Sequence, residues 1–236
     1  MDPTLARKAT AEAVGTGLLV AVVVGSGIMA QRLSPDDVGL QLLVNSTATA
    51  GGLVALILAF GSVSGAHFNP VVTLADRFFG GTTSREAVAV IPAQVIGACL
   101  GAMVANLMFD LDAVTLSTHH RSSGGLWLGE VVATFGLLLV ILGVVRSGRA
   151  SAAPFAVAGY IAAAYWFTSS TSFANPAVTI GRTLTDTFAG IAPSSAPAFI
   201  VAQLLGGAIA IALARYLYPD RPATDLIVPH DHADAT

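Results

Sequence analysis

The sequence predicts an all-α membrane protein with six transmembrane helices and two re-entrant half-helices, arranged as an inverted 3+3 repeat. Three observations predict this fold class: the composition, the lengths of the apolar segments and a short polar motif that occurs twice. Of the 236 residues, 54% are hydrophobic and 11% are charged, whereas soluble domains carry about 25% charged residues. The mean hydropathy is +0.75. The composition therefore predicts an integral membrane protein.

Six apolar segments are long enough to cross the hydrocarbon core of a bilayer, which is about 30 Å thick. They cover residues 9–30, 40–60, 86–109, 126–146, 150–168 and 197–218. The first segment follows Arg7 and Lys8 and resembles a signal peptide in this respect. It has the length of a span and no convincing cleavage site follows it, so we interpret it as the first transmembrane helix.

Basic residues predict the orientation in the membrane. If the N-terminus is cytoplasmic, the inner segments carry eight basic residues, namely Arg7, Lys8, Arg77, Arg85, Arg146, Arg149, Arg215 and Arg221. The outer segments carry only Arg32, Arg121 and Arg182. Basic residues accumulate on the cytoplasmic side of membrane proteins. We therefore expect a multi-pass protein of the cell (inner) membrane with both termini in the cytoplasm.

The chain also repeats itself. A Glu followed four residues later by Thr occurs in the first span (Glu12) and in the fourth (Glu130), "IPAQVIGACLGA" in the third span matches "FIVAQLLGGAIA" in the sixth, and an Asn-Pro pair follows the second and the fifth. A repeat of three spans must enter the membrane upside down the second time. We expect a first repeat at 1–110, an outer loop at 111–125, a second repeat at 126–218 and a disordered cytoplasmic tail at 219–236.

The two Asn-Pro stretches, "SGAHFNPVVTLADR" and "SFANPAVTIGR", each predict a short helix that starts at its Asn. Asn is a favoured N-cap and Pro a favoured first helical residue. Small and hydroxylated residues precede each pair, and non-helical backbone at membrane depth is tolerated only where it is buried in protein or lines a water-filled cavity. The sequence therefore predicts a polar path with pore-lining carbonyls, which we place at Gly65, Ala66, His67, Thr171 and Phe173.

Inversion brings the starts of the two half-helices together near the membrane midplane. Each start carries about half a positive charge, and the amides of Asn69 and Asn175 would form the central constriction. Such a pore favours small uncharged molecules over cations.

These motifs resemble the aquaporin (major intrinsic protein) family over about residues 9–218, through "SGAHFNPVVT", "SFANPAVT" and the Glu-x-x-x-Thr starts of spans one and four. The resemblance implies a right-handed bundle, a pore in every protomer and a homotetramer in the lipid bilayer. The function that the resemblance implies is passive transport of water and small neutral solutes across the membrane. The family's outer constriction falls by spacing on Thr49, Ala163, Ser172 and Val178.

The chain departs from the family at Val178, where an arginine is usual. We therefore expect a wide, arginine-free outer filter that admits glycerol-sized polyols, as in bacterial aquaglyceroporin-like members. Some bacterial members with an aliphatic residue at this position occur alongside arsenic resistance, which makes neutral metalloid hydroxides or small arsenicals candidate solutes. The alternatives are a water-selective channel whose mouth Arg182 or the outer loop restricts, a secondary transporter, or an ion-conducting pore.

Three further polar groups allow two interpretations each. Glu12 and Glu130 would bind protons in a transporter, but in a channel they would anchor the re-entrant loops through hydrogen bonds, and we favour anchoring. His67 could act as a pH gate, and we favour a fixed pore-lining group. Arg182 could supply positive charge to the vestibule, although its spacing favours a surface pair with Asp186.

Other functions find no support in the sequence. A net charge of −3 without a basic stripe argues against nucleic-acid binding. We identify no activated nucleophile, phosphate-binding loop or cofactor motif, and so expect no enzyme, no catalytic residue and no cofactor. Two pairs of histidines, His119 with His120 and His230 with His232, are too few to predict a metal site.

Overall fold

The structure is a computed structural model that describes residues 4–219. Within this range the chain forms eight α-helices: α1 (Leu5–Leu33), α2 (Val38–Ser64), α3 (Pro70–Phe79), α4 (Ser84–Met108), α5 (Gly124–Arg146), α6 (Ala153–Phe167), α7 (Pro176–Gly181) and α8 (Ala196–Leu217). Two 3₁₀ helices, η1 (Ala150–Ala152) and η2 (Arg182–Leu184), precede α6 and follow α7. The predicted tail from residue 220 onward, with Arg221, His230 and His232, lies outside the described residues.

Six of these helices, α1, α2, α4, α5, α6 with η1, and α8, are long and apolar enough to cross a membrane. The six predicted spans are therefore confirmed, with ends that differ by a few residues. Their outward faces carry exposed aliphatic side chains, such as Val88, Ile96 and Leu100 on α4 and Val201 and Leu205 on α8. Such faces are favourable in lipid, because transfer of apolar side chains from water to hydrocarbon lowers the free energy.

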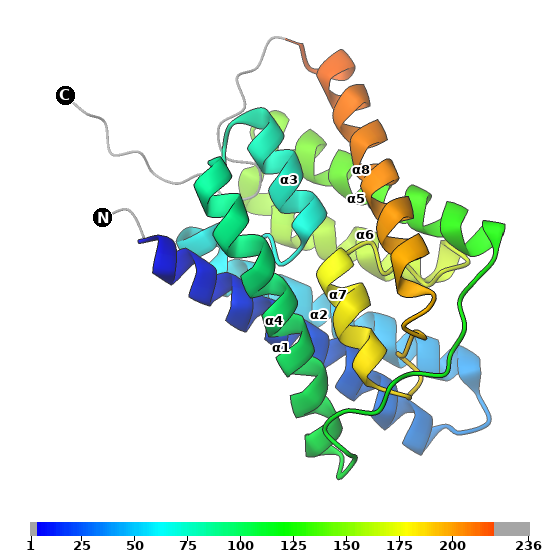
Figure 1. The fold of residues 1–236 in the computed structure, drawn as a ribbon. Coiled ribbons are helices and arrows are strands. Elements are labelled where there is room, and N and C mark those ends of the chain that lie inside the picture. The colour runs from blue at the N-terminus through cyan, green and yellow to red at the C-terminus, as the bar shows by residue number, and fades with distance from the viewer. Residues whose placement is uncertain (1–3, 220–236) are drawn as a thin grey trace.

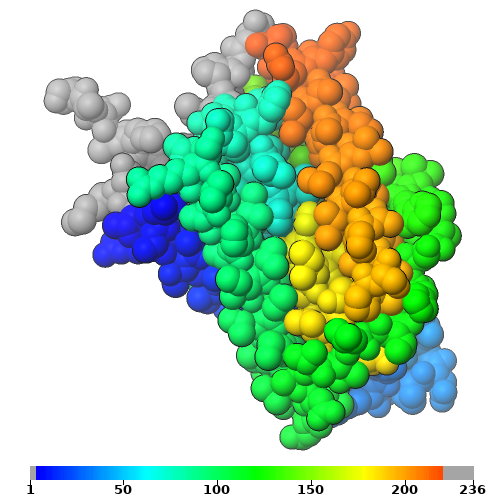
Figure 2. All heavy atoms as spheres, in the orientation of Figure 1, coloured from blue at the N-terminus to red at the C-terminus, as the bar shows by residue number. Residues whose placement is uncertain are grey.

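The two remaining helices are the predicted half-helices. The Oδ1 atom of Asn69 accepts a hydrogen bond from the Val71 amide at 3.0 Å, and that of Asn175 accepts from the Ala177 amide at 3.0 Å. Each asparagine therefore caps its helix, and proline follows as the first helical residue. Figure 1 shows α3 and α7 running from the middle of the bundle toward opposite ends. Figure 2 shows atoms of α7 at the surface between α4 and α8.

The long helices pack in two matching pairs, α1 with α4 and α5 with α8. Glycines allow the close approach within each pair. A Cβ atom at Gly101 of α4 would lie 2.0 Å from the carbonyl oxygen of Gly17 in α1, and one at Gly206 of α8 would lie 2.3 Å from that of Val131 in α5. Small residues are typical of such contacts in membranes. This matched packing favours the predicted division into repeats 1–110 and 126–218, which stays a prediction.

Both described ends of the chain lie on one side of the bundle. At the start of α1, Lys8 Nζ lies 2.8 Å from Glu86 Oε1 at the start of α4. Near the end of α8, the Arg215 guanidinium lies 5.6 Å from the centre of the Phe78 ring at the end of α3. Figure 1 shows the start of α1 and the end of α8 on the side of the α3–α4 turn. An even number of spans with both ends on one side is consistent with the predicted topology.

Candidate functional site: a pore between the half-helices

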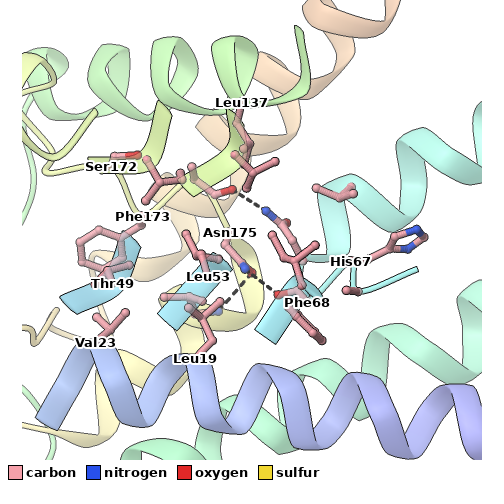
Figure 3. Close-up of a pocket in the computed structure, with 18 of the residues that line it drawn as sticks. Leu19, Val23, Thr49, Leu53, His67, Phe68, Leu137, Ser172, Phe173 and Asn175 are labelled. Atoms are coloured by element: carbon pink, nitrogen blue, oxygen red, sulfur yellow. Dashed lines mark hydrogen bonds between the residues drawn. The ribbon is translucent and has the colours of Figure 1, made fainter. Parts of the chain in front are cut away.

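A cavity lies between α1, α2, α5 and α6 and the two half-helices with the loops that lead into them. The spans contribute mainly aliphatic side chains: Leu19, Val23, Leu53, Ile57, Leu137, Ile141, Val157 and Ile161. The two loops contribute Ala66, His67, Phe68 and Asn69 from one side and Ser172, Phe173, Ala174 and Asn175 from the other. Figure 3 shows Asn175 in the middle of this cavity, with His67 and Phe173 toward opposite ends.

The two asparagines connect the half-helices across the cavity. Asn69 Nδ2 donates a hydrogen bond to the carbonyl oxygen of Ala174 at 2.8 Å. Asn175 Nδ2 donates in the same way to the carbonyl oxygen of Phe68 at 2.7 Å. Each amide thus holds the residue that precedes the other asparagine. The structure brings Asn69 and Asn175 together at one level of the cavity, as a central constriction requires.

The loops that precede the asparagines have an unusual backbone. Ala66 and Phe68 have φ angles of 49°, and the corresponding residues of the second loop, Ser172 and Ala174, have φ angles of 52° and 50°. Non-glycine residues with positive φ are uncommon and cost free energy unless the surroundings hold them. Because the loops are neither helix nor strand, their N–H and C=O groups need other partners.

Glu12 supplies those partners for the first loop. Its Oε1 atom accepts hydrogen bonds from the His67 amide at 2.9 Å and from Ser64 Oγ at 2.6 Å. Its Oε2 atom accepts from the Phe68 amide and from Gln94 Nε2, both at 2.7 Å. The carboxylate is completely buried, and four donors compensate for its lost hydration.

Glu130 repeats this arrangement for the second loop. It accepts hydrogen bonds from the amides of Phe173 and Ala174, both at 2.9 Å, and from Gln203 Nε2 at 2.5 Å. Gln203 also donates to Thr179 Oγ1 at 2.8 Å and so connects the carboxylate to α7. These contacts are the ones that the anchoring hypothesis requires.

We name the two ends of the cavity outer and inner after the predicted topology. The outer end contains three of the four predicted filter positions. Thr49, Ser172 and Val178 line it, whereas Ala163 is exposed on the outside of α6, so its prediction as a filter residue is wrong. Tyr165 lines the cavity instead, and its hydroxyl lies 3.1 Å from Thr49 Oγ1. The family spacing misplaced this position, because the face of α6 that carries Val157, Ile161 and Tyr165 lines the cavity and Ala163 lies on the opposite face.

Of the five residues whose carbonyls we expect to line the pore, three line the cavity and two do not. Ala66, His67 and Phe173 are among the residues that line the cavity, whereas Gly65 and Thr171 are not. Gly65 is the residue that ends α2, with a φ of 84°. The Thr171 amide donates to the Thr168 carbonyl at 3.2 Å in a turn that follows α6. Both residues therefore belong to the ends of spans rather than to the lining.

His67 is held in one position at the inner end. Its Nδ1 atom lies 3.1 Å from Thr73 Oγ1, and its Nε2 atom lies 3.7 Å from Asp76 Oδ2. The side chain is 7% exposed. This geometry agrees with a fixed lining group, which is the interpretation that the sequence favoured.

Arg182 does not form the predicted surface pair with Asp186. It is 2% exposed, lines the cavity, donates through Nε to the Ala189 carbonyl and stacks on the Phe173 ring, with Cζ 3.4 Å from the ring centre. Asp186 instead accepts a hydrogen bond from the Thr118 amide at 2.8 Å. The prediction is wrong because α7 ends at Gly181 and the chain is extended by Thr185, so the helical spacing no longer applies.

Sequence reasoning missed Tyr165, which lines this end of the cavity, and Arg121, which contacts Phe173 but is not among the lining residues. The guanidinium of Arg121, from the loop between α4 and α5, lies 5.3 Å from the centre of the Phe173 ring, and its Nε donates to the Gly190 carbonyl at 3.1 Å. For Tyr165 a signal was present, because it follows Ile161 by one helical turn and both face the cavity. For Arg121 we find no such signal, since the course of a long loop does not follow from its sequence.

Comparisons with known proteins relate this chain to one family of membrane channels. A family model described as "Major intrinsic protein" matches residues 1–172. The chain is 51% identical over 219 residues to "Aquaglyceroporin AqpS" of Rhizobium meliloti, which covers 92% of this chain and 93% of that protein. It is 31% identical over 245 residues to "Probable aquaporin AqpM" of Archaeoglobus fulgidus, covering 92% and 99%.

A similar fold occurs among solved structures. The X-ray structure of the aquaglyceroporin from Plasmodium falciparum superposes with a TM-score of 0.67 at 20% sequence identity, covering 92% of this chain and 98% of that one. At this identity the similarity concerns the fold. It agrees with the six spans and two half-helices described above.

Proposed function

Because the chain belongs to the major intrinsic protein family and is a passive channel for water and small solutes such as glycerol, we propose that the cavity between its half-helices is the pore. The observation that carries this proposal is the pair Asn69 and Asn175, whose amides meet in the cavity from opposite directions. We assign transport to this chain and no enzymatic reaction.

The central amides favour uncharged solutes. Each amide has two N–H bonds, and the hydrogen bond across the cavity uses one of them. The second can donate to an oxygen of water or of a solute hydroxyl. The amide oxygens accept hydrogen bonds from the N–H groups of their own half-helices. A cation therefore meets N–H donors and the positive ends of two helices, so its entry costs free energy.

The cavity has an aliphatic part and a part lined by loop carbonyls, and this combination favours solutes with hydroxyl groups on a short carbon chain. Aliphatic side chains such as Leu19, Leu53 and Leu137 line one part, and the loops with their carbonyls line another. Glycerol can place its carbon atoms against the former and its hydroxyls against the latter. A neutral metalloid trihydroxide has a similar size and carries hydroxyls without charge, so we include it among the proposed solutes.

The outer constriction sets the size of the solutes. Val178 is 5% exposed and has an aliphatic side chain at a position where arginine is usual in the family. With Thr49 and Ser172 it contributes small and medium-sized uncharged side chains to an end of the cavity that Tyr165 and Arg182 also line. We therefore propose a constriction that admits solutes larger than water.

The family membership and the six apolar helices identify a multi-pass membrane protein. We further propose that it resides in the cell membrane with both termini in the cytoplasm, and that four copies assemble with one pore in each. The positive-inside bias supports the orientation, and the exposed aliphatic faces provide surface for lipid and for neighbouring subunits.

Stopped-flow light scattering of proteoliposomes tests the function. Wild type, Val178→Arg and the control Val178→Ile are compared under gradients of an impermeant sugar, glycerol and a neutral arsenical. We expect wild type and Val178→Ile to pass water and both solutes, and Val178→Arg to reduce solute flux, because it narrows and charges the constriction.

Three other results would contradict this proposal. Water flux without solute flux in wild type would indicate a water-selective channel. Saturable uptake coupled to an ion gradient would indicate a secondary transporter. Current in planar bilayers would indicate an ion-conducting pore.

A further inference from the structure

Position 178 lacks an arginine, yet a guanidinium is present at the outer end of the cavity. Arg182 is buried and lines the cavity together with Val178, Thr49 and Tyr165. We propose that Arg182 is the specificity-determining residue of the outer mouth and replaces an arginine at position 178. This inference rests on the proposed function, because it assumes that the cavity conducts.

The local backbone explains how Arg182 reaches the cavity. Val178 belongs to α7, and Arg182 follows four residues later at the start of η2. Four helical residues correspond to a rise of about 6 Å, so Arg182 starts further from Asn175 than Val178 does. Helical side chains lean toward the N-terminus of their helix. The long side chain of Arg182 therefore leans back toward the pore, and the short side chain of Val178 leaves room for it.

Two contacts hold the guanidinium in this place. Nε donates to the carbonyl oxygen of Ala189, and Cζ lies 3.4 Å from the centre of the Phe173 ring. The first contact is a charge-assisted hydrogen bond and the second a cation–π interaction. Phe173 is itself fixed against Phe199, with ring centres 5.2 Å apart. The guanidinium is therefore a positioned group and not a mobile surface charge.

The charge of Arg182 is not neutralised by an ion pair within residues 4–219. The ion pairs of this part of the chain involve Lys8, His67 and His119 as the basic partners. A guanidinium has five N–H bonds, of which the Ala189 carbonyl uses one. The remaining donors can meet solute oxygens, while the positive charge repels cations and the bulk of the side chain limits solute size.

Arg121 offers a matched control. Its guanidinium also faces the Phe173 ring, at 5.3 Å, but Arg121 is not among the residues that line the cavity. Arg182→Met and Arg121→Met remove the same charge from the same ring and retain most of the aliphatic stem. Only the first changes the proposed pore.

The experiment measures the ratio of erythritol to water permeability in proteoliposomes. We expect this ratio to rise about three- to tenfold for Arg182→Met, because the guanidinium no longer limits the size of the solute; the range corresponds to the free energy of one hydrogen bond. We expect Arg121→Met to leave the ratio close to that of wild type, because Arg121 is not among the residues that line the cavity. The double variant Val178→Arg with Arg182→Met should restore a ratio close to that of wild type.

An unchanged ratio for Arg182→Met, or an equal rise for Arg121→Met, overturns the proposal. If Arg182→Met does not fold, Arg182→Lys replaces it. Lysine keeps the charge and loses the planar group that stacks on Phe173, so a raised ratio supports the proposal and a wild-type ratio overturns it. Absence of both water and glycerol flux from wild type would overturn the channel function itself, which this design detects before any variant is compared.

Discussion

The side-chain amide of Asn69 donates a 2.8 Å hydrogen bond to the carbonyl oxygen of Ala174, although 105 positions separate the two residues in the sequence. Asn175 returns the same contact to Phe68. Each asparagine also caps its own half-helix through Oδ1. One side chain therefore starts a helix and fixes the opposite loop.

Replacing either asparagine should cost more stability than the loss of a helix cap. Asn175→Ala removes the cap, which is worth about 1 kcal/mol, and leaves the buried Phe68 carbonyl without its donor, which costs about 1–3 kcal/mol more. Ser123→Ala is the control, because Ser123 caps α5 without a contact across the pore. Thermal or denaturant unfolding in detergent measures the difference. Equal losses for the two variants would mean that the contact across the pore contributes nothing.

Neutralising the buried glutamates should damage folding more than selectivity. In Glu12→Gln and Glu130→Gln, an amide NH₂ group faces the N–H donors that the carboxylate accepts from, and each hydrogen bond to a charged group is worth about 1.5–3 kcal/mol. We expect lower unfolding midpoints, with unchanged solute-to-water ratios in the protein that remains folded. Glu86→Gln is the control, because its partner Lys8 is partly exposed and such pairs contribute about 0–1 kcal/mol. Normal folding together with loss of gradient-coupled uptake would instead support a transporter.

Adding a methyl group at the helix crossings should disrupt the bundle. Gly101→Ala and Gly206→Ala place Cβ atoms 2.0 and 2.3 Å from backbone oxygens of the neighbouring helices, which cannot rotate away. We expect a loss of about 1–3 kcal/mol, as for overpacked cores. Gly51→Ala should be neutral or slightly stabilising, because nothing lies within 4 Å of its added Cβ. Yield of folded protein from detergent extracts, by size-exclusion chromatography, measures this. Normal yields for all three variants would argue against close helix contacts at Gly101 and Gly206.

Acid should loosen the attachment of the outer loop. The Thr118 backbone amide and hydroxyl donate to Asp186 and lower the pKa of its carboxyl from the usual value. A carboxyl with a lowered folded pKa stabilises the fold above its unfolded pKa of about 3.9, and this contribution is lost as the pH falls through the lower folded value. The protection of residues 111–123 against hydrogen exchange, relative to the intrinsic rate at the same pH, should therefore fall below about pH 4 in wild type.

Two variants check this interpretation. Asp186→Asn should show faster exchange in the outer loop already at neutral pH, with a weaker dependence on acid. Thr118→Ala removes only the hydroxyl donor and keeps the backbone donor, so its effect should be intermediate. Exchange rates in Asp186→Asn that match wild type at neutral pH would show that another contact holds the loop.

Most of the fold followed from the sequence because lipid imposes simple rules on it. Span lengths, the inverted repeat and the starts of the half-helices each depend on local residues. Thr49, Ser172 and Val178 follow from their spacing in the family that the sequence resembles, and all three line the cavity. The same spacing gives Ala163, which is wrong because it does not say which face of α6 turns toward the cavity. Tyr165 lies half a helical turn away from it and faces the cavity instead.

Arg182 shows a second limit of prediction from sequence spacing, after the misplaced Ala163. A spacing of four residues predicts contact with Asp186 only while the helix continues, and here it does not. Whether a helix stops after six residues depends on tertiary contacts such as the one with Ala189. Local spacing in the sequence does not reveal such contacts between segments. It therefore favours the surface interpretation over the vestibule interpretation.

The reciprocal contacts of Asn69 and Asn175 also bear on how the chain is made. A ribosome delivers the first three spans to the membrane before the second half exists, and at that moment the Phe68 carbonyl and the Asn69 amide have no partner from the later segment. Their partners arrive only with residues 174 and 175. The contacts between the two half-helices therefore form only after residues 174 and 175 have been synthesised.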